Sequence, residues 1–202
     1  MQLFHSPGSP FVRKVVALVH EAGRVGDLAL VPATVSPVTS GDATLAHNPL
    51  GKIPTLQRPD GPALYDSRVI CRYLDAHWDA GLYPETRIWD VLTLEATADG
   101  IMDAAVLMTY EARFRPAEMR SQEWVDGQWG KIARSLDALE TRWMSHLAGR
   151  LDMGQIALAC ALAYVDFRHG DRNWRAGHAP LAEWFAKIEA RESMQATQPP
   201  AA

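Results

Sequence analysis

Cysteine is scarce in this sequence of 202 residues, which contains only Cys71 and Cys160. Each lies in an apolar run with helical spacing, and this pair predicts neither a disulfide framework nor a zinc site. We therefore expect a reduced, cytoplasmic protein. The N-terminus lacks the basic region and apolar run of a secretory signal. No apolar run approaches the ~18 residues of a membrane span, so no membrane partner is expected.

Positive charge is also in short supply. The chain has 20 Lys and Arg against 24 Asp and Glu, a formal net charge of −4. Without a basic surplus to neutralise phosphates, nucleic acid is not an expected partner. The 7 His residues are scattered without the spacing of ligands, so no metal is expected. Apolar residues, at 48%, are plentiful enough for an ordinary globular core.

The pattern of the chain changes near residue 80, which indicates two domains. Residues 1–77 alternate short strand-like and helical segments in the order β-α-β-α-β-β-α, with the last two strands, IPTLQ and PALY, forming a hairpin. This order predicts a mixed sheet with helices packed on it. After a linker at residues 78–86, long helical patterns replace the strands, so residues 86–202 are expected to form an all-helical domain.

Three local motifs bear on function. In SPGSPFVRKV, Ser9 and Pro10 match the N-cap and first position of a helix. In NPLGKIPTL, the position of Pro54 is typical of a proline at the edge of a strand. In YDSRVICRYL, Asp66 and Ser67 match an N-cap pair that opens another helix. Taken alone, each motif is explained by local structure.

Together these motifs resemble the glutathione S-transferase superfamily. The resemblance covers essentially the whole chain and is strongest from Met1 to Trp78 and from Leu151 to Ser193. It implies a thioredoxin-like N-terminal domain followed by a helical-bundle C-terminal domain. It also implies glutathione as co-substrate, a homodimer, and a role in detoxification.

The resemblance implies a catalytic role for Ser9, because serine-type members of this family place a serine at this point beside the glutathione sulfur. A free thiol is only ~3% ionised at pH 7, and lowering its pKa by two units requires about 2.7 kcal/mol. One charge-assisted hydrogen bond plus a helix N-terminus supplies a stabilisation of this size. Ser6, in the same loop, is the alternative. A serine in place of a cysteine disfavours disulfide exchange.

The same resemblance implies the other glutathione contacts. It implies a cis Ile53–Pro54 bond, which turns the Ile53 main chain toward the cysteinyl backbone of glutathione. Ser67 is expected to hold the γ-glutamyl carboxylate and Asp66 the α-ammonium group. Lys52 is expected either near a glutathione carboxylate or in solvent.

Five further residues have a functional or a structural interpretation. In the family, the first long helix of the second domain borders the second-substrate pocket, which implies roles for Met102, Tyr110 and Arg113; core packing is the alternative for the methionine. Arg13 lies one turn after Ser9, either aiding the thiolate or in solvent. Asp152 opens a motif similar to the family's capping box and is expected to be structural.

The expected function is that of a glutathione transferase that adds the glutathione thiolate to a small, hydrophobic electrophile. A glutathione-dependent isomerase or lyase is one alternative, because the same thiolate serves both. A non-catalytic glutathione-binding scaffold or stress protein is another.

Overall fold

Two structural units make up the computed structural model, which describes residues 1–200. The first comprises Met1–Thr86 and the segment from Glu192 onward, and the second comprises Arg87–Arg191. The expected division placed 86–202 in one helical domain. The segment from Glu192 groups instead with the first unit, because its helix packs on the first helix of the chain.

The first unit is built on a three-stranded sheet with the order β2-β1-β3. β1 (Gln2–His5) runs parallel to β2 (Ala29–Pro32) and antiparallel to β3 (Thr55–Gln57). Leu3 of the central strand lies opposite Leu56, and both are fully buried. This mixed sheet confirms the thioredoxin-like N-terminal fold.

The expected hairpin is reduced to a strand and a bridge. Leu56 and Leu64 exchange two main-chain hydrogen bonds of 2.9 Å, and this pair is an isolated bridge. Pro62 has no N–H with which to extend the ladder. The fourth strand of the predicted order is therefore present only as this single bridge.

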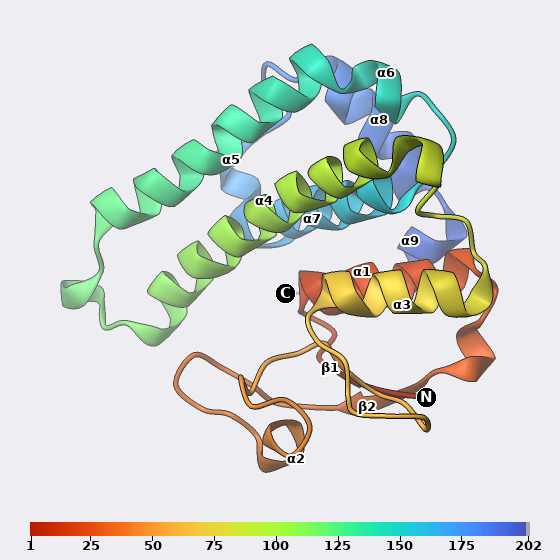
Figure 1. The fold of residues 1–202 in the computed structure, drawn as a ribbon. Helices are drawn as coiled ribbons and strands as arrows, with labels where there is room; N and C mark the ends of the chain where they lie inside the picture. Colours follow the sequence, from red (N-terminus) through yellow and green to blue (C-terminus); the bar gives the residue numbers. More distant parts are fainter. Residues whose placement is uncertain (201–202) are drawn as a thin grey trace. The chain divides into compact units, whose positions relative to one another are not determined.

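Helices α1 (Pro10–Glu21) and α3 (Ser67–Trp78) pack against each other in the first unit (Figure 1). α1 begins where expected, because Ser9 is its N-cap and Pro10 its first residue. The unit also contains α2 (Asp42–Leu45) and α9 (Glu192–Ala196). Its 3₁₀ turns are η1 (Val25–Asp27) and η2, which spans Glu85–Arg87 at the boundary of the two units.

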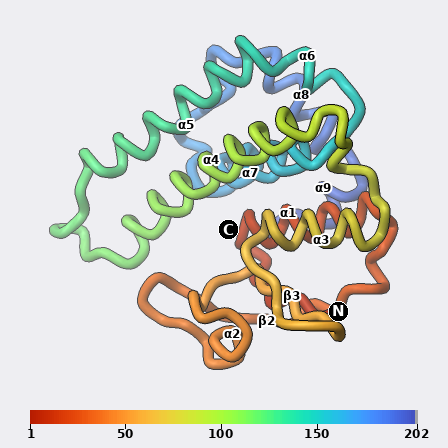
Figure 2. Tube along the Cα trace, in the orientation of Figure 1, coloured from red at the N-terminus to blue at the C-terminus, as the bar shows by residue number. Residues whose placement is uncertain are grey.

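The second unit is helical, as expected. Its long helices are α4 (Ile88–Phe114), α5 (Gln122–Arg142) and α7 (Met153–His169), and α4 and α7 run side by side (Figure 2). The shorter elements are η3 (Ala117–Met119), α6 (Met144–Leu147), η4 (Gly170–Arg172) and α8 (Ala179–Glu189).

Helix α7 forms the centre of the second unit. Every residue from Met153 to Val165 is buried, which matches its nearly continuous apolar sequence. A Cβ atom at Gly154 would lie 2.9 Å from the main-chain oxygen of Val91 in α4. Glycine is therefore required for the close approach of the two helices.

Asp152, the N-cap of α7, is fully buried, and its role is structural, as expected. Its Oδ1 accepts a hydrogen bond of 3.1 Å from the main-chain N–H of Gln155. Its Oδ2 lies 2.8 Å from Nε2 of His146 and 3.5 Å from Nη2 of Arg87. These partners offset the cost of burying a carboxylate.

Candidate functional site

Ser9 lies at the N-terminus of α1, directly after the loop that leaves β1. Its Oγ accepts a hydrogen bond of 3.3 Å from the main-chain N–H of Val12, and its own N–H donates to the Ser6 carbonyl at 3.0 Å. Because this cap uses the oxygen as an acceptor, the hydroxyl proton is left to donate elsewhere. The partial positive charge of the helix terminus adds to that donor, so the position favours an anion such as a thiolate.

His5, the last residue of β1, is a titratable group next to this loop that the sequence motifs did not single out. Partial burial lowers its pKa below the ordinary value of 6.5. The lowered pKa favours the neutral imidazole at pH 7. Its place at the end of a strand and before the Ser-rich loop was the only signal in the sequence.

The loop before β3 carries the predicted cis bond between Ile53 and Pro54, which the structure confirms. Pro54 is buried, whereas Lys52 is exposed. Within residues 1–200, neither the main-chain N–H nor the C=O of Ile53 has a hydrogen-bond partner. An extended ligand can therefore pair with this residue as an added strand does.

Asp66 and Ser67 open α3 as predicted. Asp66 Oδ1 accepts from the main-chain N–H of Arg68 at 3.0 Å, and Oδ2 lies 2.9 Å from Nη2 of the same residue. Partial burial acts to raise the pKa of Asp66, but the hydrogen bonds and charge of Arg68, with a smaller part from Lys14, lower it below the ordinary 3.8. The carboxylate is therefore ionised and suits an ammonium group.

The fold brings these segments to one edge of the first unit. Phe4 of β1 lies opposite Thr55 of β3, so Pro54 lies near the end of β1 and the loop that follows it. Helices α1 and α3 begin at this same edge, which places Ser9 and Asp66 at neighbouring helix N-termini (Figure 1). The arrangement offers the Ser9 hydroxyl as a hydrogen-bond donor to an anion, the unpaired main-chain N–H and C=O of Ile53, and the Asp66 carboxylate.

Arg13 belongs elsewhere. It is buried, and its guanidinium donates to the main-chain oxygen of Met194 at 2.9 Å and to Oγ1 of Thr197 at 3.3 Å. Ser193 of the same C-terminal segment donates to a carboxylate oxygen of Glu21. Both expectations for Arg13 are corrected, because it fixes the C-terminal segment onto α1 and is neither a solvated side chain nor directed to the Ser9 loop.

The three residues expected to contact a second substrate differ in exposure. Met102 is fully buried in α4, in keeping with core packing, while Tyr110 is half-buried and Arg113 is exposed. Burial, together with the nearby Tyr164, raises the pKa of Tyr110, although Arg113 opposes this. Tyr110 is therefore a neutral phenol, one turn before a cation on the same helix.

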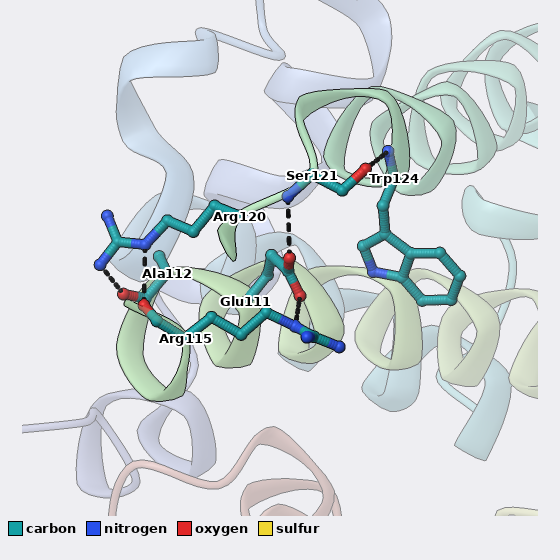
Figure 3. A network of polar contacts seen from close by, with 6 residues as sticks. All are labelled: Glu111, Ala112, Arg115, Arg120, Ser121 and Trp124. Carbon is teal, nitrogen blue, oxygen red and sulfur yellow. Dashed lines mark hydrogen bonds and ion pairs between the residues drawn. The ribbon is translucent and has the colours of Figure 1, made fainter. Parts of the chain in front are cut away.

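A polar network holds the end of α4 that carries Tyr110 and Arg113 (Figure 3). Glu111 is buried and accepts from the main-chain N–H of Ser121 at 3.0 Å and from Nε of Arg115 at 2.7 Å. Arg120 donates to the main-chain oxygen of Ala112 at 2.6 Å. No local sequence pattern predicts this network, which closes the connection from α4 to α5.

Residues 1–200 contain neither a metal-binding cluster nor a helix suited to span a membrane. No group of three or more His, Cys, Asp or Glu side chains there has the arrangement of a metal site. None of the helices in this part of the chain is both long enough and apolar enough to cross a membrane.

Known family models match both the N-terminal and the C-terminal part of the chain. Residues 8–77 match the family model of the glutathione S-transferase N-terminal domain, and residues 122–187 match that of its C-terminal domain. The uncharacterized GST-like protein YibF of Escherichia coli K12 is 33% identical, with 100% of both chains covered.

Two solved structures from Pseudomonas fluorescens Pf-5 are more similar still. Both are of a glutathione transferase family member. One, with bound glutathione, is 48% identical, covers 99% of each chain and has a TM-score of 0.96. The other, with bound S-(propanoic acid)-glutathione, is 47% identical, covers 100% of each chain and has a TM-score of 0.92. From its two domain matches and these relatives, the chain belongs to the glutathione S-transferase family.

Proposed function

We propose that this protein is a glutathione transferase in which the Ser9 hydroxyl stabilises the thiolate of bound glutathione. The observation that carries the proposal is the cap geometry, in which Ser9 accepts from Val12 and keeps its own proton for a ligand. The relative from Pseudomonas fluorescens with bound glutathione supports the choice of ligand.

The remaining contacts follow the chemistry of the tripeptide. Ile53 pairs its main chain with the cysteinyl residue, and Ser67 offers its hydroxyl and N–H to the γ-glutamyl carboxylate. Asp66, an ionised carboxylate, pairs with the α-ammonium group. Lys52 is exposed beside this loop and attracts a glutathione carboxylate. As in the family generally, we propose a homodimer.

For the second substrate, we propose a small electrophile that carries a carboxylate. The relative with bound S-(propanoic acid)-glutathione supports this class. Tyr110 and Arg113 provide a phenol and a guanidinium suited to a carboxylate. In the addition, the sulfur lone pair forms a C–S bond at the β-carbon of an unsaturated acid, the π electrons move to the α-carbon, and water supplies the proton there.

A lyase is the second candidate function. The relative binds an acid-bearing thioether of glutathione, and a compound of this class is both what addition to an unsaturated acid would form and what elimination would consume. In elimination water takes the proton from the α-carbon, the electron pair of that C–H bond forms the C=C bond, and the C–S bond breaks; the same Ser9 hydroxyl stabilises the departing thiolate. Progress curves started from the unsaturated acid and from the thioether distinguish the two directions.

The test compares Ser9→Ala with Ser6→Ala. We expect Ser9→Ala to abolish the ultraviolet thiolate band of bound glutathione and to lower kcat/KM by about tenfold to hundredfold, since a hydrogen bond to a charged group is lost. Ser6→Ala serves as the matched control, with the parent thiolate band retained. An unchanged band and turnover in Ser9→Ala would contradict the proposal. Binding without turnover by the parent would favour the scaffold alternative.

A further inference from the structure

The peptide unit between Lys52 and Ile53 is held by two buried side chains. Asn48 Nδ2 donates to the Lys52 carbonyl oxygen at 3.0 Å, and Thr55 Oγ1 donates to the same oxygen at 2.8 Å. Asn48 is 1% exposed and Thr55 is fully buried. Two donors on one carbonyl saturate its lone pairs and leave that oxygen little freedom to turn.

The two side chains are also bonded to each other and to the loop. Asn48 Nδ2 donates to Thr55 Oγ1 at 3.1 Å, and Asn48 Oδ1 accepts from the main-chain N–H of Leu50 at 3.0 Å. The main-chain N–H of Gly51 donates to the Asn48 carbonyl at 2.9 Å. Buried polar groups connected in this way order a loop, because each loses partners if the others move.

Because the peptide unit is planar, fixing the direction of the Lys52 carbonyl also fixes the direction of the Ile53 N–H. In a trans peptide, the C=O and the N–H point in opposite directions within one plane. With the Lys52 oxygen turned inward toward Asn48 and Thr55, the Ile53 N–H is turned outward. That N–H has no partner within residues 1–200.

We infer that Asn48 and Thr55 are positioning residues, which orient the Ile53 N–H toward an acceptor oxygen of the glutathione main chain. They act through the Lys52 carbonyl and do not touch the ligand. This inference rests on the proposed function, because it takes glutathione as the ligand. The preorganised donor saves the ordering cost that a mobile loop would incur on binding.

The test uses Thr55→Val and Thr55→Ser, which separate the hydroxyl from the side-chain shape. Valine keeps the volume but removes the donor to Lys52, whereas serine keeps the donor. We expect calorimetric titration with glutathione to show about tenfold weaker binding for Thr55→Val and near-parent binding for Thr55→Ser, as for loss of one buried hydrogen bond.

An NMR readout reports positioning directly, without ligand. We expect the amide order parameter of Ile53 to be about 0.85 in the parent and in Thr55→Ser, and to fall toward about 0.6 in Thr55→Val. Ile132→Val, a buried change in the second unit, is the stability control. It is expected to lower Tm with glutathione affinity and the Ile53 order parameter unchanged.

Four results would contradict the role of Asn48 and Thr55 or the proposed function. Equal glutathione affinity of parent and Thr55→Val, or an unchanged Ile53 order parameter, would overturn the inference alone. Equal weakening by Ile132→Val would do the same, since the loss would then follow stability. No binding by the parent would overturn the proposed function and this inference with it. Should Thr55→Val not fold, Asn48→Asp removes the amide donor and is compared by the same two measurements.

Discussion

Asp66 and Asp152 each cap a helix, one in each structural unit, but their carboxylates face different surroundings. The Asp66 side chain is 53% exposed and is paired with Arg68 from its own helix. The Asp152 side chain is fully buried and lies against His146 and Arg87, which come from other segments. The same local rule thus leaves one carboxylate open to a ligand and commits the other to the fold.

The largest effect is expected from Asp152→Ala. This change leaves the His146 and Arg87 groups without their buried anion and removes the cap of α7, so we expect a loss of about 3–5 kcal/mol in the free energy of unfolding. Urea unfolding measures it. A loss below about 1 kcal/mol, the value of an ordinary exposed cap, would erase the contrast with Asp66.

Asp66→Ala is expected to act on binding more than on stability. We expect about tenfold or greater weakening of glutathione binding, from the loss of a charge-assisted contact, with a stability loss of only about 1 kcal/mol. Ser121→Ala is the matched control, because Ser121 caps α5 through the N–H of Trp124 at 3.2 Å and lies outside the proposed glutathione site. Equal effects of both variants on affinity would show that Asp66 acts only as a cap.

A smaller effect is expected when the parent and Asp66→Asn are compared across acidic pH. The pKa of Asp66 is lowered in the folded state, so the stability that its ionised form contributes is fully present above the unfolded value of 3.8. It is lost as the pH falls through the lower folded value. The stability difference between parent and variant should therefore be constant near neutrality and shrink below pH 3.8. A difference that changes between pH 7 and 5 would contradict this.

The smallest effect concerns His169, at the end of α7. Burial lowers its pKa from 6.5, although its hydrogen bond to the Ala105 oxygen, at 2.9 Å, acts the other way. The unfolded chain takes up the proton more readily, so stability falls as the pH drops below 6.5. We expect His169→Gln to lessen the stability loss between pH 7.5 and 5.5, as measured by urea unfolding. The pKa of His5 is lowered in the same direction, so His5→Gln is the comparison variant.

The parts of the candidate site that could be predicted are those set within a few residues of chain. The caps at Ser9, Asp66 and Asp152 follow from short motifs, because the donors they accept from lie two or three residues away. The family resemblance implied the cis Ile53–Pro54 bond, whereas the starts of α1 and α3 followed from their capping motifs, and the structure confirms all three.

The parts that were missed depend on partners distant in sequence or on the detail of burial. Arg13 is bonded to an oxygen 181 residues further along the chain, and no local pattern reveals such a contact. Glu111 reaches Ser121 only because the loop between their helices folds back. The hydrogen bonds that Asn48 donates depend on where the fold positions the Lys52 carbonyl and the Thr55 hydroxyl.

The helix caps, the order of the first three strands and the change from an α/β to a helical pattern follow from the sequence, because apolar periodicity and capping act over a few residues. Tertiary structure alone decided which of two aspartates is open and which is buried. It also decided that Arg13 holds the C-terminal segment and that the Lys52 carbonyl is held from within. The physical reason is that burial and long-range hydrogen bonds arise only when distant segments pack together.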